Sequence, residues 1–525
     1  MIAHAHLESR SRAERMPPLL VRADASTQMG TGHVMRCLAL AQAWQEAGGR
    51  AQFALALSTP AAEARLSAEG MQVARVSAGN VDLRAAFPFG GRPGSAEDAG
   101  ETVAMAREIG AAWVVVDGYH FDAAYQRSVK GAGLQLLAVD DYGHASHYSA
   151  DLVLNQNIYA AESLYPSREA TTRLLLGTRY ALLRSEFWPW RAWQRTVPEV
   201  ARKVLVTMGG ADADNATLKV VEALRQVEGL GQGLEVKVVV GGSNPHREAL
   251  RETLTAGVEL IENAPNMPEL MAWSDAAVSA AGTTCWELAF MQVPSLLVVL
   301  AENQRPNAAG LQEAGVAVNM GWHGELASAE LARALTRLLG TREQQVAMAQ
   351  EGRRLVDGEG ARRVAGLLAE ATVRVRRVAP QDRELLFLWA NDPLTRQMSL
   401  RSEAIEWEEH RHWFDQVVSC PGVFLVIAEG WTGERWAPLG QVRIDRAGVV
   451  SIALAAEHRG HGLARRVLQA GIAMHRSRTP SEALTAYIKP ENEASLRIFA
   501  QAGFTPMGWA EVLGQWLLKY IRACG

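Results

Sequence analysis

The sequence predicts an α/β protein built from two doubly wound lobes, followed by a smaller mixed α/β domain. Short apolar runs alternate with amphipathic stretches from Leu19 onward, which is the pattern of parallel strands connected by helices. The same alternation starts again after Pro198, and it changes near Ala371. A chain of 525 residues has room for about three such folding units.

The elements expected in each lobe follow from the length and spacing of these runs. In the first lobe we expect strands at 19–22, 52–57, 113–116 and 134–139, with helices at 34–47 and 100–109. In the second lobe we expect strands at 203–208, 235–240, 257–261, 276–279 and 295–300, with helices at 216–227, 246–255 and 307–314. A helical stretch at 328–371 closes this region, and a strand at 373–378 opens the last domain. The expected boundaries are 1–17 for a flexible tail, 18–197 and 198–371 for the lobes, and 372–525 for the last domain.

Composition argues against several classes of function. A net charge of −4 argues against nucleic acid or an anionic membrane as the main partner, because both require basic patches. No apolar run is long enough to span a bilayer, and the first sixteen residues lack the apolar centre of a secretory signal. The four cysteines are far apart in the sequence, which predicts neither a zinc site nor disulfides and fits a reducing, cytoplasmic location. They are Cys37, Cys285, Cys420 and Cys524.

The densest polar motif lies between the first strand and the first helix. The strand ends at Arg22-Ala23-Asp24, and a loop with Gly30 and Gly32 leads to His33 at the helix start. The glycines permit a tight loop, and the positive end of the helix dipole disfavours an imidazolium at His33. A lone histidine is more often a loop or cap residue. At a glycine-rich strand–helix junction beside Asp24, however, a neutral imidazole that accepts a proton from water is the favoured hypothesis.

Two more loops of small residues precede helices in the second lobe. One is Gly209-Gly210 with Asp212 after it, and the other is Gly282-Thr283-Thr284 with Glu287 on the first helical turn. Such loops at helix N-termini are typical phosphate sites. Glu287 either accepts hydrogen bonds from a ribose diol or is a helix-start carboxylate that the dipole favours.

The last domain carries its own glycine loop. A strand at 452–455 leads into Arg459-Gly460-His461-Gly462-Leu463-Ala464, and an amphipathic helix follows. The glycines let the backbone approach a ligand, and successive N–H groups at the helix start point at an anion such as pyrophosphate. Further on, a strand at 483–488 precedes Asn492, which opens a helix that ends at Gly503-Phe504.

With both motifs in this order, the region from Val373 to the end resembles the GNAT acetyltransferases. The resemblance implies acetyl-CoA as co-substrate, bound by Leu454, Arg459, Gly460, His461, Gly462, Leu463, Ala464 and Asn492. Runs at 388–393 and 410–414 are similar to acetyltransferases that act on small amines and nucleotide-linked amino sugars. Many members protonate the departing thiolate with a Tyr where this chain has Phe499, so this acid is in doubt. Tyr487 is a candidate substitute, and Glu429 and Asp445 are candidate bases.

The region from Leu19 to Ala371 resembles the UDP-sugar hydrolases of pseudaminic acid biosynthesis, which have two Rossmann-like lobes of the GT-B (MurG-like) class. The resemblance rests on Gly30–Cys37, Asp117-Gly118-Tyr119, Gly209–Asp212, Gly282–Glu287 and Glu302–Gln304. It implies that His33 activates water and that Asp24 and Tyr119 orient His33 or the sugar. It also implies a UDP-sugar site without a metal, formed by Arg22, Gly32, Gly209, Gly210, Asp212, Gly282, Thr283, Thr284, Glu287, Asn303 and Gln304.

Together the two resemblances predict a bifunctional enzyme. It would acetylate N4 of a UDP-4-amino-4,6-dideoxy-N-acetyl-altrosamine and then hydrolyse UDP-2,4-diacetamido-2,4,6-trideoxy-β-L-altrose by attack of water at the anomeric carbon. Three alternatives stay open. The lobes could be a glycosyltransferase with another acceptor, they could bind a nucleotide sugar only to regulate the acetyltransferase, or the acetyltransferase could act on protein amines.

Overall fold

The computed structural model describes residues 16–26, 28–77, 93–210, 212–227, 233–242, 244–254, 257–420, 422–432, 435–476, 478–479 and 483–523. These residues form two compact units, one ending at Gly366 and the other beginning at Leu367. Most of the expected tail and Cys524 lie outside the described residues. No helix of the described residues is long and apolar enough to cross a membrane.

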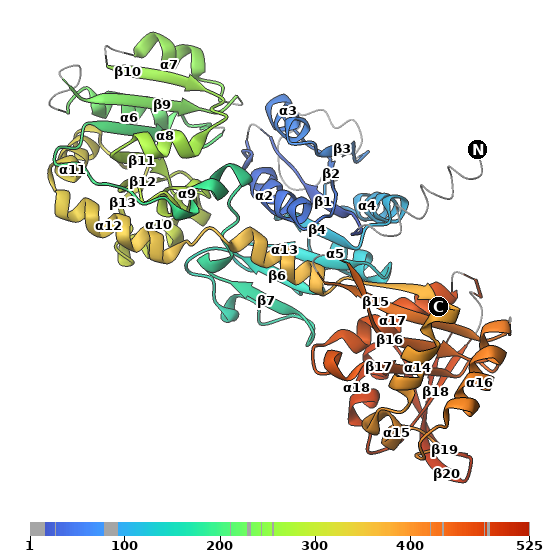
Figure 1. The fold of residues 1–525 in the computed structure, drawn as a ribbon. Helices are drawn as coiled ribbons and strands as arrows, with labels where there is room; N and C mark the ends of the chain where they lie inside the picture. The colour runs from blue at the N-terminus through green and yellow to red at the C-terminus, as the bar shows by residue number, and fades with distance from the viewer. Residues whose placement is uncertain are drawn as a thin grey trace, which may run out of the picture. The chain divides into compact units, whose positions relative to one another are not determined.

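The first lobe is built on a seven-stranded parallel sheet with the order β3-β2-β1-β4-β5-β6-β7 (Figure 1). Its strands are β1 (Leu19–Ala23), β2 (Ala51–Leu55), β3 (Gln72–Arg75), β4 (Trp113–Asp117), β5 (Gln135–Val139), β6 (Leu152–Asn155) and β7 (Arg173–Leu176). Its helices are α2 (Gly32–Glu46), α3 (Pro60–Ala68), α4 (Ala96–Ile109) and α5 (Ala123–Gly131), with short 3₁₀ turns η1 (Glu162–Leu164), η2 (Thr178–Tyr180) and η3 (Ser185–Ala192). Every residue of β1 and β4 is buried, because helices cover both faces of a parallel sheet.

The second lobe repeats this architecture with a six-stranded parallel sheet, β10-β9-β8-β11-β12-β13. Its strands are β8 (Lys203–Thr207), β9 (Glu235–Val240), β10 (Val258–Glu262), β11 (Ala276–Ala280), β12 (Ser295–Val299) and β13 (Ala317–Trp322). Its helices are α6 (Ala216–Leu224), α7 (Arg247–Thr253), α8 (Met267–Trp273), α9 (Thr284–Phe290), α10 (Arg305–Glu313), α11 (Ser328–Gly340), α12 (Arg342–Leu355) and α13 (Gly360–Glu370), with η4 (Glu302–Gln304). Val204 and Val206 of β8 pack into one hydrophobic core and Leu205 into another, so alternate residues fill both faces.

Both lobes have a point where the strand order reverses, between β1 and β4 in the first and between β8 and β11 in the second. Ligands of doubly wound folds bind beyond the carboxyl ends of the strands at such points. The loops that follow these four strands are therefore the places to look for a site.

The second unit has two antiparallel sheets, one with the order β14-β15-β16-β17 and one with the order β18-β20-β19. The strands are β14 (Val373–Arg377), β15 (Phe424–Trp431), β16 (Trp436–Ile444), β17 (Val450–Leu454), β18 (Leu484–Ile488), β19 (Thr505–Val512) and β20 (Gln515–Arg522). The helices are α14 (Arg383–Ala390), α15 (Pro393–Met398), α16 (Trp407–Ser419), α17 (Leu463–Arg476) and α18 (Glu493–Gln501), with η5 (Pro380–Asp382) and η6 (Ala456–His458). A single parallel bridge, between Val449 and Thr485, joins the sheets next to β17 and β18. The two strands therefore pair at one end and separate beyond it.

The predicted fold class is confirmed: two parallel α/β sheets precede a mixed α/β region. In the two lobes, sequence analysis missed β3, β6, β7 and β13. Among these, β3 and β7 are short, partly exposed edge strands with little apolar signal. In the last domain it gave no strand for β15, β16, β19 or β20. The helical stretch predicted at 328–371 is divided into three helices, α11, α12 and α13. The chain leaves the helical conformation at Thr341 and again before Gly358, whose φ of 82° lies in the left-handed region.

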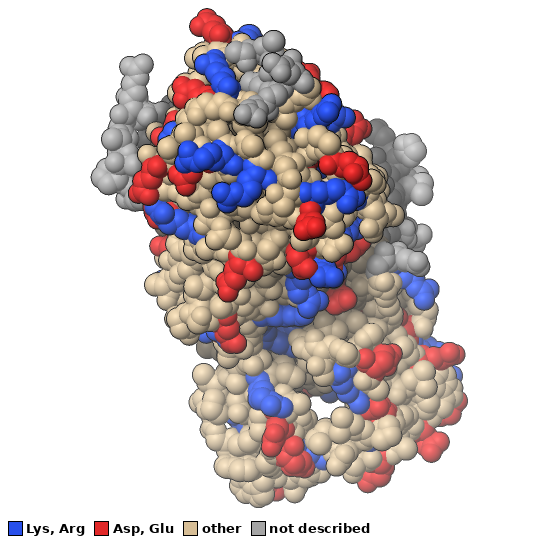
Figure 2. All heavy atoms as spheres, turned by 90° about the vertical axis from the view of Figure 1, so that its left-hand side faces the viewer, with Lys and Arg blue, Asp and Glu red and all other residues tan. Residues whose placement is uncertain are grey.

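The face of the molecule in Figure 2 carries basic and acidic side chains interspersed over wide uncharged areas. Such a surface has no extended field of one sign on this face. It is consistent with the small net charge and favours ligands that are held by a few local groups.

Candidate active sites

The first candidate site, called the lobe site, centres on His33 and Asp117. His33 lies on the first turn of α2 and Asp117 is the last residue of β4, which pairs directly with β1. The imidazole Nδ1 lies 2.6 Å from Asp117 Oδ1. A carboxylate accepts the Nδ1 proton of a neutral imidazole, which leaves Nε2 free to accept a proton from water.

Asp117 also takes part in a buried ion cluster. Arg36 donates from Nε to Asp117 Oδ2 at 2.6 Å and from Nη1 to Asp141 Oδ1 at 2.7 Å, so one guanidinium bridges two carboxylates. Burial opposes the charged form of Asp117, but Arg36 and His33 outweigh it and hold the pKa of this carboxyl well below its usual range. Burial likewise opposes ionisation of Asp141, and Arg36 lowers its pKa. Asp117, Asp141 and Arg36 are therefore all charged at neutral pH.

Tyr119 connects this cluster with the second lobe. Its hydroxyl donates to Asp141 Oδ2 at 2.7 Å and accepts from Asn303 Nδ2 at 2.8 Å. Its ring meets the His33 ring edge-on, with 5.3 Å between the centroids. Burial raises the pKa of the Tyr119 hydroxyl, so the group is a neutral donor rather than a base. Tyr119 and Asn303, both predicted site residues, thus lie next to each other and to His33.

Asp24 and Arg22 have different partners from those we expected. Asp24 is fully buried, accepts the N–H groups of Ala56 and Leu57, and lies 3.2 Å from His120 Nε2. The histidine beside Asp24 is therefore His120, not His33, and the carboxylate on His33 is Asp117. Arg22 is also fully buried, and its guanidinium donates to Asp98 at 3.0 and 2.7 Å. Arg22 thus has a structural role, because its buried side chain ties the end of β1 to Asp98 of α4.

The glycine loops of the two lobes approach each other. A Cβ on Gly210 would lie 2.6 Å from Thr31 Oγ1, and a Cβ on Gly32 would lie 4.0 Å from Thr283 Oγ1. Gly209 has a φ of 86° and so needs the freedom of glycine to turn the chain after β8. The loop before His33 therefore faces the two small-residue loops of the second lobe.

Three other predicted ligands are engaged within the fold. Asp212 accepts the N–H groups of Ala216 and Thr217 at 2.7 and 3.0 Å and so caps the start of α6. Glu287 pairs with Arg184 at 2.8 Å, and burial raises the pKa of its carboxyl. Gln304 Oε1 accepts the Leu300 N–H at 2.9 Å. Thr284 begins α9 beside Gly282 and Thr283, and a Cβ on Gly282 would lie 3.6 Å from Gln304 Nε2, so these loops are neighbours.

The second candidate site, called the GNAT site, is the loop from Arg459 to Leu463 where β17 and β18 separate. Gly460 and Gly462 have φ of 82° and 72°, and a Cβ on either would meet nothing within 4 Å. α17 begins directly after them at Leu463, so its first N–H groups border this open space. Arg459 supports the loop by donating to the Leu454 carbonyl at 3.0 Å and pairing with Asp392 at 2.7 Å. The open glycine loop and helix start fit the diphosphate of acetyl-CoA.

The remaining predicted groups of the GNAT site have structural contacts. Asn492 Oδ1 accepts the Ser495 N–H at 3.1 Å and caps α18. His461 lies between the two glycines of the loop, and Ala464 lies on the first turn of α17. Phe499 is buried and packs edge-on against Phe504. Glu429 pairs with Arg374 and Arg376, and Asp445 accepts two N–H groups in the turn before β17. Both candidate bases thus have structural partners in this geometry.

Family models match both regions of the chain. The model described as "Glycosyltransferase family 28 C-terminal domain" matches residues 203–362, and the model described as "Acetyltransferase (GNAT) domain" matches residues 372–505. The spore coat polysaccharide biosynthesis protein SpsG of Bacillus subtilis is 30% identical over 231 residues, which cover 43% of this chain and 67% of SpsG. The chain belongs to the SpsG family. Its GNAT domain implies that this SpsG-family chain uses acetyl-CoA.

Other similar proteins extend this picture. The UDP-2,4-diacetamido-2,4,6-trideoxy-beta-L-altropyranose hydrolase of Campylobacter jejuni is 24% identical to the SpsG-family chain over 304 residues, which are 57% of this chain and 98% of that enzyme. The crystal structure of Acinetobacter baumannii MurG is 17% identical and has a TM-score of 0.47, covering 67% of this chain and 99% of MurG. The two family-model matches and the Campylobacter relative confirm the resemblances noted from the sequence.

Sequence reasoning gave no role to Arg36, Asp117 or Asp141 of the SpsG-family chain. A signal was present, because Asp117 and Asp141 follow buried strands whose carboxyl ends meet at one edge of a parallel sheet. Among the described residues, no group of three or more His, Cys, Asp or Glu side chains is arranged to hold a metal ion.

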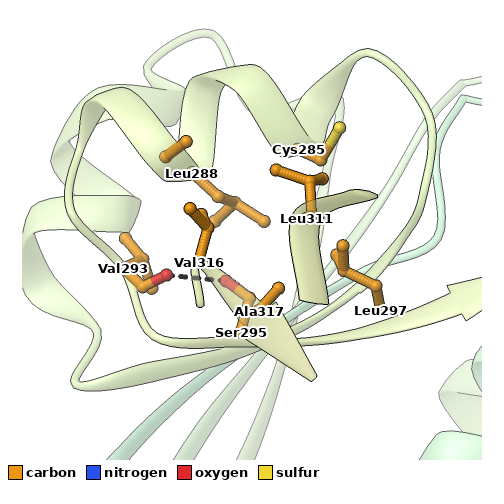
Figure 3. A pocket seen from close by; sticks show the side chains of 9 residues that line it. Cys285, Leu288, Val293, Ser295, Leu297, Leu311, Val316 and Ala317 are labelled. Carbon is orange, nitrogen blue, oxygen red and sulfur yellow. Dashed lines mark hydrogen bonds between the residues drawn. The ribbon is translucent and has the colours of Figure 1, made fainter. Parts of the chain in front are cut away.

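The SpsG-family chain also has a small cavity beneath α9, shown in Figure 3. It measures about 10 Å³, which is at most the size of one water molecule. Its lining is mainly apolar, and burial raises the pKa of the Cys285 thiol beside it well above the usual range. This cavity is a packing defect below the helix that carries Thr284 and Glu287, and it is too small for a ligand.

Proposed function

We propose that the chain is a bifunctional enzyme that acts on a UDP-linked amino sugar. The GNAT site would acetylate N4 of UDP-4-amino-4,6-dideoxy-N-acetyl-altrosamine. The lobe site would then hydrolyse the resulting UDP-2,4-diacetamido-2,4,6-trideoxy-β-L-altrose to UDP and free sugar. The observation that carries the hydrolytic half is the His33–Asp117 pair at the edge of the first sheet, opposite the glycine loops of the second lobe. The activity in the name of the Campylobacter relative supports the choice of substrate.

In the proposed hydrolysis, His33 Nε2 takes a proton from water as the water oxygen attacks the anomeric carbon. The bond between that carbon and the diphosphate oxygen breaks, and its electron pair leaves with UDP. Asp117 stabilises the imidazolium that forms, as the carboxylate does in a Ser-His-Asp triad. His33 then returns its proton to solvent or to the leaving diphosphate.

Departure of UDP requires stabilisation of negative charge. The loop Gly282-Thr283 leads into α9 at Thr284, and backbone N–H groups at this helix start can supply this stabilisation. The first N–H groups of α6 are already taken by Asp212, so Gly209-Gly210 would contribute by letting the diphosphate approach the end of β8. Asn303 and Tyr119 lie between these loops and His33, where they would orient the sugar. Glu287 and Asp212 would shape the nucleotide site through their contacts with Arg184 and the α6 N-terminus.

In the proposed acetylation, acetyl-CoA supplies the acetyl group as a thioester. The neutral sugar amine attacks the thioester carbonyl and its nitrogen gives up a proton. The C–S bond breaks with its electron pair on sulfur, and the thiolate of CoA takes up a proton. Gly460, Gly462 and the start of α17 would hold the diphosphate, and Arg459 and Leu454 would fix the loop beside β17. Because Phe499 is a buried core residue, the proton for the thiolate would come from another group or from water.

One experiment tests both halves. The full chain is incubated with the 4-amino UDP-sugar, acetyl-CoA and ¹⁸O-water, and the products are analysed by mass spectrometry. We expect acetyl-CoA-dependent release of UDP, with heavy oxygen at C1 of the free sugar. Label in UDP would mean attack at phosphorus and would refute the proposed mechanism.

The glycosyltransferase family 28 match favours a second candidate, transfer of the sugar to an acceptor other than water. The same incubation separates the two functions, since it contains no acceptor. Stoichiometric free sugar supports the hydrolase. Intact UDP-sugar that is consumed only after an acceptor is added would support the transferase.

A further inference from the structure

The buried ion cluster next to His33 has more negative than positive charge. Arg36 is the only cation that the described contacts place between Asp117 and Asp141, and both carboxylates are nearly inaccessible to solvent. Their low pKa values and the raised pKa of Arg36 keep all three groups charged at neutral pH. Two negative charges and one positive charge leave a net charge of −1. Such a charge away from water is costly unless a further cation is close.

Asp141 is the member of this cluster that does not touch His33. It accepts from Arg36 Nη1 at 2.7 Å, from the Tyr119 hydroxyl at 2.7 Å and from Asn157 Nδ2 at 2.9 Å. Asn157 Oδ1 in turn accepts from Asn307 Nδ2 of the second lobe at 2.8 Å. Three neighbouring groups thus hold the Asp141 carboxylate, and two of them, Tyr119 and Asn157, are themselves bonded to the second lobe.

We propose that Asp141 is a positioning residue for the hydrolytic step, which sets the proton affinity of His33 through Arg36 and Asp117. The excess carboxylate charge of the cluster is neutralised when His33 takes the proton of the attacking water. The cluster is therefore most stable in the state in which the base is protonated, and this strengthens a base that must work at neutral pH. This inference rests on the proposed hydrolase function.

Other titratable groups around the cluster do not remove its excess charge. The hydroxyls of Tyr119 and Tyr159 and the thiol of Cys37 are neutral because burial raises their pKa values. Asp140 is paired with His144, whose pKa this carboxylate raises against the effect of burial. Tyr142 packs on Tyr119 and has a raised pKa. A proton on His144 offsets the charge of Asp140, so the excess charge of the cluster remains, and His33 is the imidazole in direct contact with the cluster.

The test is the pH dependence of UDP release from the diacetylated UDP-sugar by the full chain. Activity requires unprotonated His33, so it rises with pH through an acid limb. In Asp141→Asn the excess negative charge is gone, so His33 loses its proton more readily. We expect the limb to move to lower pH by about one unit and the plateau of kcat/KM to fall roughly tenfold, since the base is weaker. In Arg36→Gln the limb should move the opposite way, to higher pH.

Two further variants keep the test decisive. Asp141→Glu retains the charge and should keep the wild-type limb. Asp151→Asn removes a buried carboxylate that pairs with Lys130 at the opposite end of the sheet, and it should lower stability without moving the limb. If Asp141→Asn does not fold, an upward shift in Arg36→Gln with an unshifted limb in Asp141→Glu supports the proposal.

The outcomes distinguish this inference from the function on which it rests. A folded Asp141→Asn whose rate falls equally at every pH overturns the positioning role and leaves the hydrolase intact, as does an unmoved limb in Arg36→Gln. Absence of UDP release by the wild-type chain overturns the proposed function, and the inference with it.

Discussion

The lobe site and the GNAT site are built in different ways. In the lobe site, charged side chains from three segments are buried together: Asp117 contacts His33, and Arg36 joins Asp117 to Asp141. In the GNAT site, the candidate anion-binding groups are backbone amides of one continuous loop, and the ion pair between Arg459 and Asp392 lies outside the glycines. The first site depends on partners far apart in sequence, whereas the second is largely local.

This difference has consequences for how each site fails. A side-chain cluster away from water loses function when one member is removed, because the remaining charges are left without partners. A backbone loop fails when a side chain fills the space where the ligand lies, while its own charges matter less. Substitutions in the two sites should therefore have separable effects within one chain.

The largest expected effect follows removal of the proposed base. His33→Ala should lower UDP release by about 10²- to 10⁴-fold, which is the usual contribution of a general base. The rate of acetyl transfer should be unchanged, as measured by the release of the CoA thiol from acetyl-CoA. His147→Ala is the matched control, because His147 is a partly exposed histidine of the same lobe that pairs with Glu169. Wild-type UDP release by His33→Ala would remove the base assignment.

The complementary change in the GNAT site is Gly462→Val. The φ of 72° strains a branched residue, and its side chain would enter the open space beside the loop. Because of this strain and this loss of space, we expect KM for acetyl-CoA to rise about tenfold or more. UDP release from the diacetylated sugar should be unaffected. Gly514→Val is a control with the same backbone conformation and equally open surroundings. Equal effects of the two variants on KM would contradict acetyl-CoA binding at this loop.

Glu429→Gln asks whether this carboxylate is a base or a structural partner. Its contacts with Arg374 and Arg376 at 2.8 Å predict a structural role. The variant should lose on the order of 1 kcal/mol of stability. The loss is small because both arginines are about a third exposed, and solvent screens their attraction to the carboxylate. Thermal melting measures the loss. The pH profile of acetyl transfer should keep its shape, and a lost acid limb would instead identify Glu429 as the base.

The smallest expected effect concerns Asn492. Its side chain caps α18, so Asn492→Ala should cost about 1 kcal/mol of stability, and Asn492→Ser should restore most of it. Acetyl-CoA titration of both variants then sharpens the assignment. If Asn492 only caps the helix, the Ser variant also restores KM. If Asn492 binds acetyl-CoA directly, KM stays raised in both.

Sequence analysis recovered the GNAT loop more fully than the lobe site. Gly460 and Gly462 precede a helix in the sequence as they do in the structure, so the motif and its geometry coincide. For His33, the sequence indicated Asp24 as the nearby carboxylate, and the structure gives Asp117 instead. Asp24 is nearer along the chain, but it lies at the end of β1 with its oxygens turned to the loop after β2 and to His120.

The sequence by itself determined the architecture, because apolar periodicity fixes strands and helices and glycines fix the tight loops before helices. It also located His33, the small-residue loops of the second lobe and the acetyl-CoA loop. Only the tertiary structure decided which charges share a partner. Arg36 reaches Asp117 and Asp141 across 81 and 105 residues, and Tyr119 reaches Asn303 across 184. The pairing of buried charges depends on distances of a few ångströms, which strand order and side-chain packing set and local sequence does not encode.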